Sequence, residues 1–73
     1  MDNGTTVANL VRFYREERGF TQARLAARSG VSLRTIRNVE SGTMEPRMDS
    51  KRKILLALGL RFEDSHRVFH PVG

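Results

Sequence analysis

Residues 21–42 read TQARLAARSGVSLRTIRNVESG, and this stretch contains two short helical segments separated by a glycine-containing turn. Thr21 is a suitable N-cap for the first segment, and Gly30 ends it because glycine adopts the left-handed conformation at little cost. Ser32 is the corresponding cap for the second segment, which continues until Gly42 stops it. Because only a few residues join the two helices, we expect them to cross steeply and not to lie antiparallel.

The second helix of this motif has an apolar face and a polar face. Ile36 and Val39 lie on the side expected to face a core, together with Glu40. An isolated arginine-rich helix is simply a solvated basic face, but the capped helix and tight turn before this one favour DNA binding. Arginine pairs bidentately with guanine, asparagine pairs with adenine, and an aliphatic group contacts the thymine methyl. The opposite face carries the predicted base-reading residues Leu33, Arg34, Arg37 and Asn38.

A set of positions from Arg15 to Gly59 matches one pattern of caps, turn glycines and core residues, and the likeness covers roughly residues 7–69. These positions are Arg15, Gly19, Phe20, Thr21, Gln22, Leu25, Ala26, Ser29, Gly30, Val31, Ser32, Ile36, Val39, Glu40, Gly42, Pro46, Ala57, Leu58 and Gly59. With them the chain resembles the helix-turn-helix domains of the Cro and lambda-repressor type, the Xre family. The resemblance implies an all-α fold, a compact five-helix bundle of the lambda-repressor-like DNA-binding type. We expect a single domain over residues 1–73, with residues 1–5 and 70–73 as loose tails.

The resemblance also implies roles for individual residues. Gln22 matches a residue that contacts a DNA phosphate and braces the recognition helix, and Thr35 lies on the flank that contacts the DNA backbone. Arg15 and Glu40 match a pair that forms a buried or half-buried salt bridge between the first and third helices. An ordinary surface charge is the alternative for Arg15. The expected phosphate contacts, for some of which a solvated charge is the alternative, are Gln22, Thr35, Thr43, Arg47 and Lys51.

Length and charge limit the possible functions. The chain has 73 residues and a formal net charge of +5. Residues 21–42 carry four arginines against one glutamate, a net +3, and residues 43–58 carry four basic against two acidic side chains, a net +2. Such a basic patch attracts phosphate, although it sets no sequence preference. A domain of this size buries only about 60% of its unfolded surface and has little room for a catalytic cleft, so we expect no enzyme activity.

Disulfides, metal sites and membrane spans find no support in the sequence. The chain has no cysteine, and its longest apolar run, residues 54–58, is far too short to cross a membrane. His66 and His70 are four residues apart, as in some helical zinc sites, but Pro71 disfavours a continuous helix there and no cysteine supplies another ligand. We therefore expect no metal or cofactor, and a cytoplasmic protein associated with the nucleoid.

The segments around the motif are expected to complete the bundle. The first helix is predicted to run from residue 5 or 6 to residue 18 with Phe13 outside its apolar stripe. In the loop of residues 43–49, Met48 is expected to point into the core. Asp49 or Ser50 is then expected to cap a fourth helix that ends at Gly59, and a short last helix should cover residues 63–68. The inward residues of the first helix are predicted to be Val7, Leu10, Val11 and Tyr14.

The C-terminal part of the chain allows two interpretations. Leu56 stands where similar domains usually have a polar residue, so it is expected to be exposed. With Val68 and Phe69 it could form a self-association surface, because similar domains commonly dimerise through their last helices. In the alternative, Val68 and Phe69 fold back on the core of their own chain. The predicted partners are a second copy of the chain and double-stranded DNA carrying an operator-like inverted repeat.

Two classes of function remain after this reading. The first is sequence-specific binding of double-stranded DNA by a transcriptional regulator, more often a repressor than an activator, that inserts its third helix in the major groove. The second is a protein-interaction module, such as an antitoxin or adaptor, that binds a partner protein with the same bundle. Three of the four residues expected on the recognition face are polar or cationic, which favours DNA. RNA binding is disfavoured because exposed aromatic residues that stack on bases are lacking.

Overall fold

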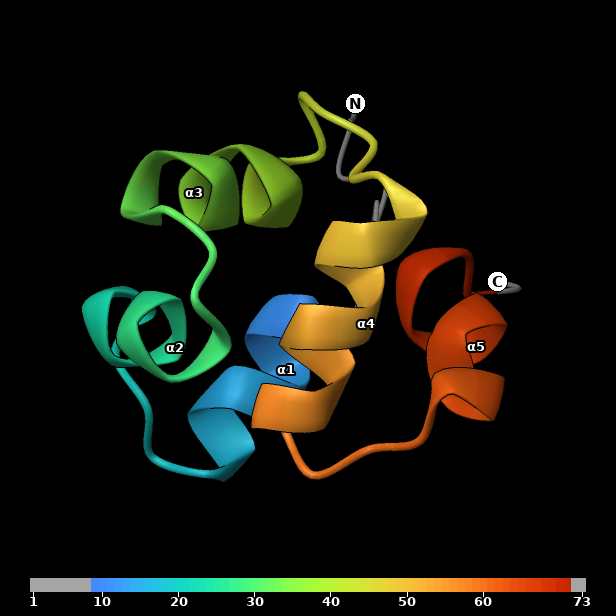
Figure 1. Ribbon diagram of the computed structural model, residues 1–73, viewed down its shortest axis with the longest axis horizontal. Coiled ribbons are helices and arrows are strands. Elements are labelled where there is room, and N and C mark those ends of the chain that lie inside the picture. Colours follow the sequence, from blue (N-terminus) through green and yellow to red (C-terminus); the bar gives the residue numbers. More distant parts are fainter. Residues whose placement is uncertain (1–8, 72–73) are drawn as a thin grey trace, which may run out of the picture.

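The computed structural model describes residues 9–71, which form five α-helices, a 3-10 turn and no strand. The helices follow one another through short connections, and α4 lies at the centre of the view in Figure 1. This architecture confirms the expected all-α bundle. The elements are α1 (Val11–Glu17), α2 (Gln22–Ser29), α3 (Leu33–Ser41), α4 (Met48–Ala57), η1 (Phe62–Asp64) and α5 (Ser65–Phe69).

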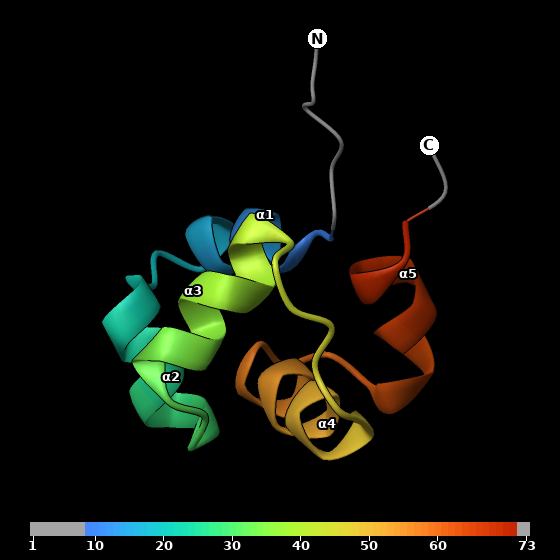
Figure 2. The same ribbon diagram turned by 90° about the horizontal axis from the view of Figure 1, so that it is seen from above.

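The helix-turn-helix pair occupies one side of the molecule. Helices α2 and α3 contact each other, and α2 also packs on α4 (Figure 1). Helix α1 contacts α3, while α5 and η1 pack on α4 at the other side, as the view from above shows (Figure 2). Helix α3 is therefore supported from behind by α1 and α2, and its far face is open.

The boundaries of α2 and α3 follow from side-chain caps and left-handed glycines. The Thr21 hydroxyl accepts a hydrogen bond from the backbone N–H of Arg24 at 3.0 Å, and the Ser32 hydroxyl accepts one from the N–H of Thr35 at 3.1 Å. Gly30 ends α2 with φ of 75° and Gly42 ends α3 with φ of 78°. A residue with a side chain would be strained at these angles. All four predicted helix ends of the motif are confirmed.

Helix α1 is shorter than the sequence predicted. It begins at Val11, because the Asn9 side chain accepts a hydrogen bond from the N–H of Val11 at 3.1 Å and the N–H of Leu10 donates to the carbonyl of Val68 at 2.7 Å. These contacts engage the backbone N–H groups of residues 10 and 11 and tie the start of α1 to α5. The part of the predicted helix before residue 9, including Val7, lies outside the described residues. Phe13 is 54% exposed, as its position outside the stripe indicated.

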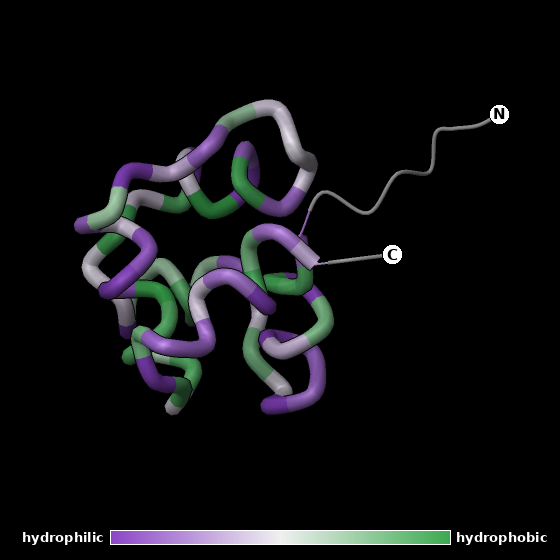
Figure 3. Tube along the Cα trace, turned by 90° about the vertical axis from the view of Figure 1, so that its right-hand side faces the viewer, coloured by the Kyte–Doolittle hydropathy of each residue, from purple (hydrophilic) through white to green (hydrophobic). Residues whose placement is uncertain are grey.

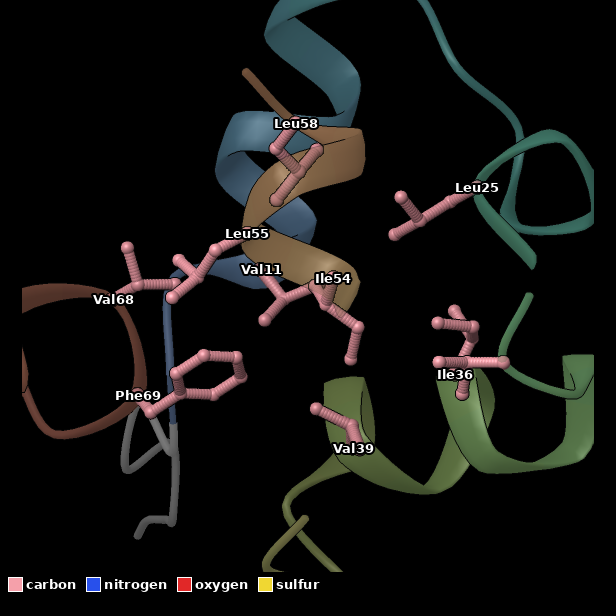
Figure 4. Close-up of a cluster of buried hydrophobic side chains, with 10 residues drawn as sticks. Val11, Leu25, Ile36, Val39, Ile54, Leu55, Leu58, Val68 and Phe69 are labelled. Atoms are coloured by element: carbon pink, nitrogen blue, oxygen red, sulfur yellow. The ribbon is translucent and has the colours of Figure 1, made fainter. Parts of the chain in front are cut away.

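The core lies where all five helices meet. Hydrophobic and hydrophilic residues alternate within the helical turns, so that one side of each helix supplies the core (Figure 3). In Figure 4, side chains from every helix point into one cluster. Full burial of a valine, leucine or isoleucine contributes about 1.5–3 kcal/mol. The buried members are Val11, Leu25, Val31, Ile36, Val39, Ile54, Leu55, Leu58, Val68 and Phe69.

The last helix corrects the expectation of a dimer surface at the C-terminus. Val68 is fully buried and Phe69 is 2% exposed, because both point from α5 into the core of their own chain (Figure 4). They therefore cannot form the self-association surface that their position in the sequence suggested. Leu56, by contrast, is 78% exposed. The predicted short last helix is confirmed as η1 followed by α5.

The loop before α4 also differs from expectation. Met48 is 56% exposed and Pro46 is buried, so the proline and not the methionine anchors this loop. Helix α4 begins at Met48 with Arg47 at its N-cap and no side-chain cap, so neither Asp49 nor Ser50 caps it. Arg47 has an extended backbone, with ψ of 161°, immediately before the first helical residue, so the helix begins before Asp49 and Ser50.

The expected tails are described only in part. Residues 1–5 and 72–73 lie outside the described residues. His70, expected to be loose, lies with its Nε2 2.9 Å from Oε2 of Glu45 in the loop after α3.

Candidate nucleic-acid interface

The open face of α3 carries the four residues predicted to read bases. Arg34 and Arg37 are exposed, while Leu33 and Asn38 are half-buried. Ile36 and Val39 lie on the buried side of the same helix, which fixes its rotation about its own axis. Among residues 9–71, no hydrogen bond or ion pair engages the guanidinium of Arg34 or Arg37, so both remain available to a ligand.

A network of charged hydrogen bonds holds α3 against α1 and α2. Nε of Arg15 donates to Oε2 of Glu40 at 2.6 Å, and its Nη2 donates to Oε1 at 3.1 Å. Nε2 of Gln22 donates to the same Oε1 at 3.1 Å, while Nη1 of Arg15 donates to the carbonyl of Phe20 at 2.7 Å. Arg15 is 8% exposed, and hydrogen bonding to Glu40 raises its pKa. The network ties the recognition helix to both neighbouring helices.

Threonine hydroxyls lie at both ends of α3. Oγ1 of Thr35 accepts a hydrogen bond from the Ser32 hydroxyl at 2.9 Å. Oγ1 of Thr43 donates to the carbonyl of Asn38 at 3.2 Å and lies 2.9 Å from the Ser41 hydroxyl. Thr43 is exposed and Thr35 is half-buried, so each can present its hydroxyl beside the helix. Two of the predicted phosphate contacts thus flank the predicted base-reading face.

Arg47 and Lys51 lie near each other in sequence but in different environments. Arg47 is exposed at the N-cap of α4. The Lys51 side chain is only 13% exposed, its Nζ lies 2.7 Å from Oε2 of Glu45, and it lies over the ring of Phe69 at 5.5 Å from the ring centre. The hydrogen bond from Lys51 lowers the pKa of Glu45, and its positive charge and that of a protonated His70 act in the same direction. Lys51 therefore has partners within the protein, whereas Arg47 is open to a ligand.

A shallow hollow beside α3 is lined in part by Arg12, a basic residue that the sequence analysis did not include in the interface. The volume of the hollow is about 390 Å³. Arg12 lies three residues before Arg15, on the same face of α1, and its side chain is 70% exposed beside Glu16. The spacing of three residues from Arg15 is the sequence signal that indicates Arg12 on this face. The hollow is lined by Arg12, Arg15, Gln22, Arg37, Glu40 and Ser41.

Other kinds of site receive no support from the described part of the chain. Within residues 9–71, no group of three or more histidine, cysteine, aspartate or glutamate side chains could hold a metal ion. The rings of His66 and His70 lie 5.9 Å apart, with no third ligand in such a group. No helix in this part of the chain is both long and apolar enough to cross a membrane.

Comparison with known proteins agrees with this geometry. The HTH_3 family, described as Helix-turn-helix, matches residues 11–65. A solved structure of an HTH_3 family transcriptional regulator from Vibrio cholerae superposes with a TM-score of 0.74 at 27% sequence identity, over 82% of this chain. The chain spans about a third of that protein, 34% of its length. No match to a curated protein accompanies these findings. Because the family match extends over most of its length, the chain belongs to the HTH_3 helix-turn-helix family.

Proposed function

We propose that this protein is a sequence-specific DNA-binding transcriptional regulator that inserts α3 in the major groove. The observation that carries the proposal is the pair of exposed arginines, Arg34 and Arg37, on a helix whose opposite face is buried. In this proposal Leu33, Arg34, Arg37 and Asn38 read bases. An α-helix fits the major groove, where each base pair presents a distinct pattern of donors, acceptors and methyl groups.

Phosphate contacts would fix the helix in the groove. We assign these contacts to Thr35, on the flank of α3, and to Gln22, Thr43 and Arg47, which lie outside that helix. Lys51 is better suited to holding the loop after α3 in place, since its ammonium group already lies 2.7 Å from Glu45. Contacts of this kind position a protein on the duplex and carry no direct sequence information.

The Arg15–Glu40 pair supports the proposal because it holds α3 in a fixed position against α1. A recognition helix that moved freely would lose part of its binding free energy to ordering on DNA. The Glu40 carboxylate accepts hydrogen bonds from α1 and α2 together, through Arg15 and Gln22. Gln22 would thereby couple a phosphate contact to the orientation of α3.

Repression is the regulatory outcome we propose, because a protein bound at a promoter excludes RNA polymerase from the same DNA. Binding as two copies to an inverted repeat, with half-sites about 10 base pairs apart, is part of this proposal. Val68 and Phe69 are in the core, so the two copies would contact each other through another surface or through the DNA alone. DNA binding would bring the protein to the nucleoid in the cytoplasm.

Titration of the isotope-labelled protein with duplex DNA, followed by NMR, tests this orientation without knowledge of the operator. We expect the largest shift changes in residues 33–38, Gln22 and Thr43, and small changes at Leu56 and Phe62. Changes centred on the end of α4 and on η1 would contradict the proposal. They would favour the second class of function, a protein-interaction module.

A further inference from the structure

An apolar groove lies at the C-terminal end of α4. Leu56 is 78% exposed and Phe62 is 38% exposed, and they border a groove of about 460 Å³. Leu55 and Leu60 also line it, while Arg52 and Arg61 complete the lining. Single exposed apolar residues are normal on protein surfaces, but exposed apolar residues that gather around a hollow mark an interaction site.

Basic side chains surround this groove. The guanidinium of Arg52 lies over the ring of Phe62, 4.2 Å from the ring centre. On the other side of Leu56, a second hollow of about 330 Å³ is lined in part by Arg28 and Lys53. Among the described residues that line the two hollows there is no carboxylate. Leu56 therefore projects between two basic, partly apolar depressions.

The acidic residues nearby do not neutralise this surface. Arg61 lies 3.1 Å from Glu63 and Lys53 lies 3.5 Å from Asp49, both in exposed pairs of the kind that contributes little stability. Within residues 9–71, neither Arg28 nor Arg52 is paired with a carboxylate. A ligand with negative charge could thus engage cations on both sides of Leu56.

We propose that this surface binds an acidic amphipathic helix of a partner protein. Apolar side chains of that helix would pack on Leu56 and Phe62, and its carboxylates would face Arg52, Arg61 and the cations near Ala57. Charge complementarity distinguishes this occupant from a second copy of the chain, which would bring arginines against arginines at a two-fold interface. The mode of binding is that of an amphipathic helix in a groove.

The position of the groove leaves the DNA-facing side accessible. Helix α4 begins after the loop that follows α3, and its C-terminal end lies away from α3 (Figure 1). A partner bound near Leu56 and Phe62 would therefore not occupy the face that carries Arg34 and Arg37. The inference is independent of the proposed DNA binding, and each can fail without the other.

Fluorescence anisotropy with synthetic peptides tests the inference on the full 73-residue chain. The probe is a labelled amphipathic helix with leucines on one face and glutamates elsewhere. One comparison peptide has lysine for every glutamate, and another has serine for every leucine. We expect saturable binding of the acidic leucine peptide alone. Leu56→Ser should weaken this binding by about tenfold or more, and Arg52→Glu should do the same.

Matched variants separate the groove from general surface effects. Phe13→Ser removes another half-exposed apolar side chain, from α1, and Arg24→Glu reverses another exposed charge; both should bind the acidic peptide like the natural chain. Circular dichroism of each variant checks the fold. The inference is overturned if the acidic peptide does not bind or if Leu56→Ser binds it as well as Phe13→Ser does. It is also overturned if sedimentation shows self-association that Leu56→Ser abolishes, since a second copy would then occupy the groove.

Discussion

Arg15 of α1 and Glu40 of α3 form a two-point ion pair, with N···O distances of 2.6 and 3.1 Å, in a site where both side chains are almost fully enclosed. The pair is surrounded by further donors and acceptors, since Gln22 donates to Glu40 and the carbonyl of Phe20 accepts from Arg15. Parallel bonds of this kind are geometrically specific. They fix how α3 lies on α1 and hence which side chains α3 presents outward.

Breaking this pair should strongly destabilise the fold. Glu40→Gln leaves the buried Arg15 guanidinium with only the exposed Glu16 carboxylate, 3.9 Å away, as a countercharge, and we expect the free energy of unfolding to fall by about 3–5 kcal/mol. Urea denaturation measures the change. Arg12→Met, which breaks the exposed pair with Glu16, is the control and should change stability by less than about 1 kcal/mol. An equal, small effect of both substitutions would show that the enclosed pair stabilises the fold no more than the exposed pair does.

The Ser32 cap of the recognition helix should stabilise the fold independently of the Arg15–Glu40 pair. Ser32→Ala removes the acceptor for the N–H of Thr35 and is expected to lower the free energy of unfolding by about 1 kcal/mol. Ser41→Ala is the matched control, because the Ser41 hydroxyl is exposed at the other end of α3 and bonds the carbonyl of Asn38 and the Thr43 hydroxyl, not a backbone N–H. Thermal melting of both variants measures the difference. If Ser41→Ala costs as much as Ser32→Ala, the cap is not the stabilising feature.

The proposed phosphate contact of Arg47 should appear in the salt dependence of DNA binding. Arg47→Ala is expected to weaken binding to all duplexes alike. It should also reduce the slope of log K against log salt by about 0.9, the value for one phosphate contact. Anisotropy titrations at several salt concentrations measure the slope. Arg61→Ala removes the same charge at η1, and its slope should match that of the natural chain; an unchanged slope for Arg47→Ala would remove it from the interface.

Protonation of Glu45, in the loop after α3, should lower the free energy of unfolding at acidic pH. The hydrogen bond from Lys51 lowers the pKa of Glu45 from its ordinary value of 4.5, so the folded state favours the charged carboxylate. This stabilisation is present above pH 4.5 and is lost as the pH falls through the lowered pKa. The stability difference between the natural chain and Glu45→Gln should therefore shrink on acidification below that value.

Urea denaturation across this pH range measures the difference, with Glu63→Gln as a control for the loss of one exposed negative charge. A difference between the natural chain and Glu45→Gln that stays constant with pH would mean that Lys51 and His70 do not act on this carboxylate.

The helix-turn-helix motif was predictable because its signals are local. Thr21, Ser32, Gly30 and Gly42 each act within four residues of their own position, so the ends of α2 and α3 could be read directly from the sequence. The outward stripe of α3 follows in the same way from helical periodicity. Exposure of Leu56 was also predictable, because similar domains usually have a polar residue at that position.

The features that the sequence did not predict depend on distant contacts. Helix α1 begins late because the N–H of Leu10 binds the carbonyl of Val68, at the other end of the chain. Periodicity alone does not indicate that Val68 and Phe69 enter the core, because α5 spans only Ser65–Phe69. Lys51 was expected to contact a DNA phosphate, yet its side chain is only 13% exposed, because Glu45 pairs with its ammonium group and the Phe69 ring lies beside it.

Selection of bound sequences from a randomised duplex pool at about 0.15 M salt tests the central claim most directly. The natural chain is compared with an Arg34→Ala, Arg37→Ala double variant and with an Arg52→Ala, Arg61→Ala double variant of equal charge. We predict an enriched inverted repeat for the natural chain and the Arg52, Arg61 control, and loss of base preference for the Arg34, Arg37 variant. No enrichment by the natural chain, or the same motif with all three proteins, would contradict the claim that α3 reads DNA sequence.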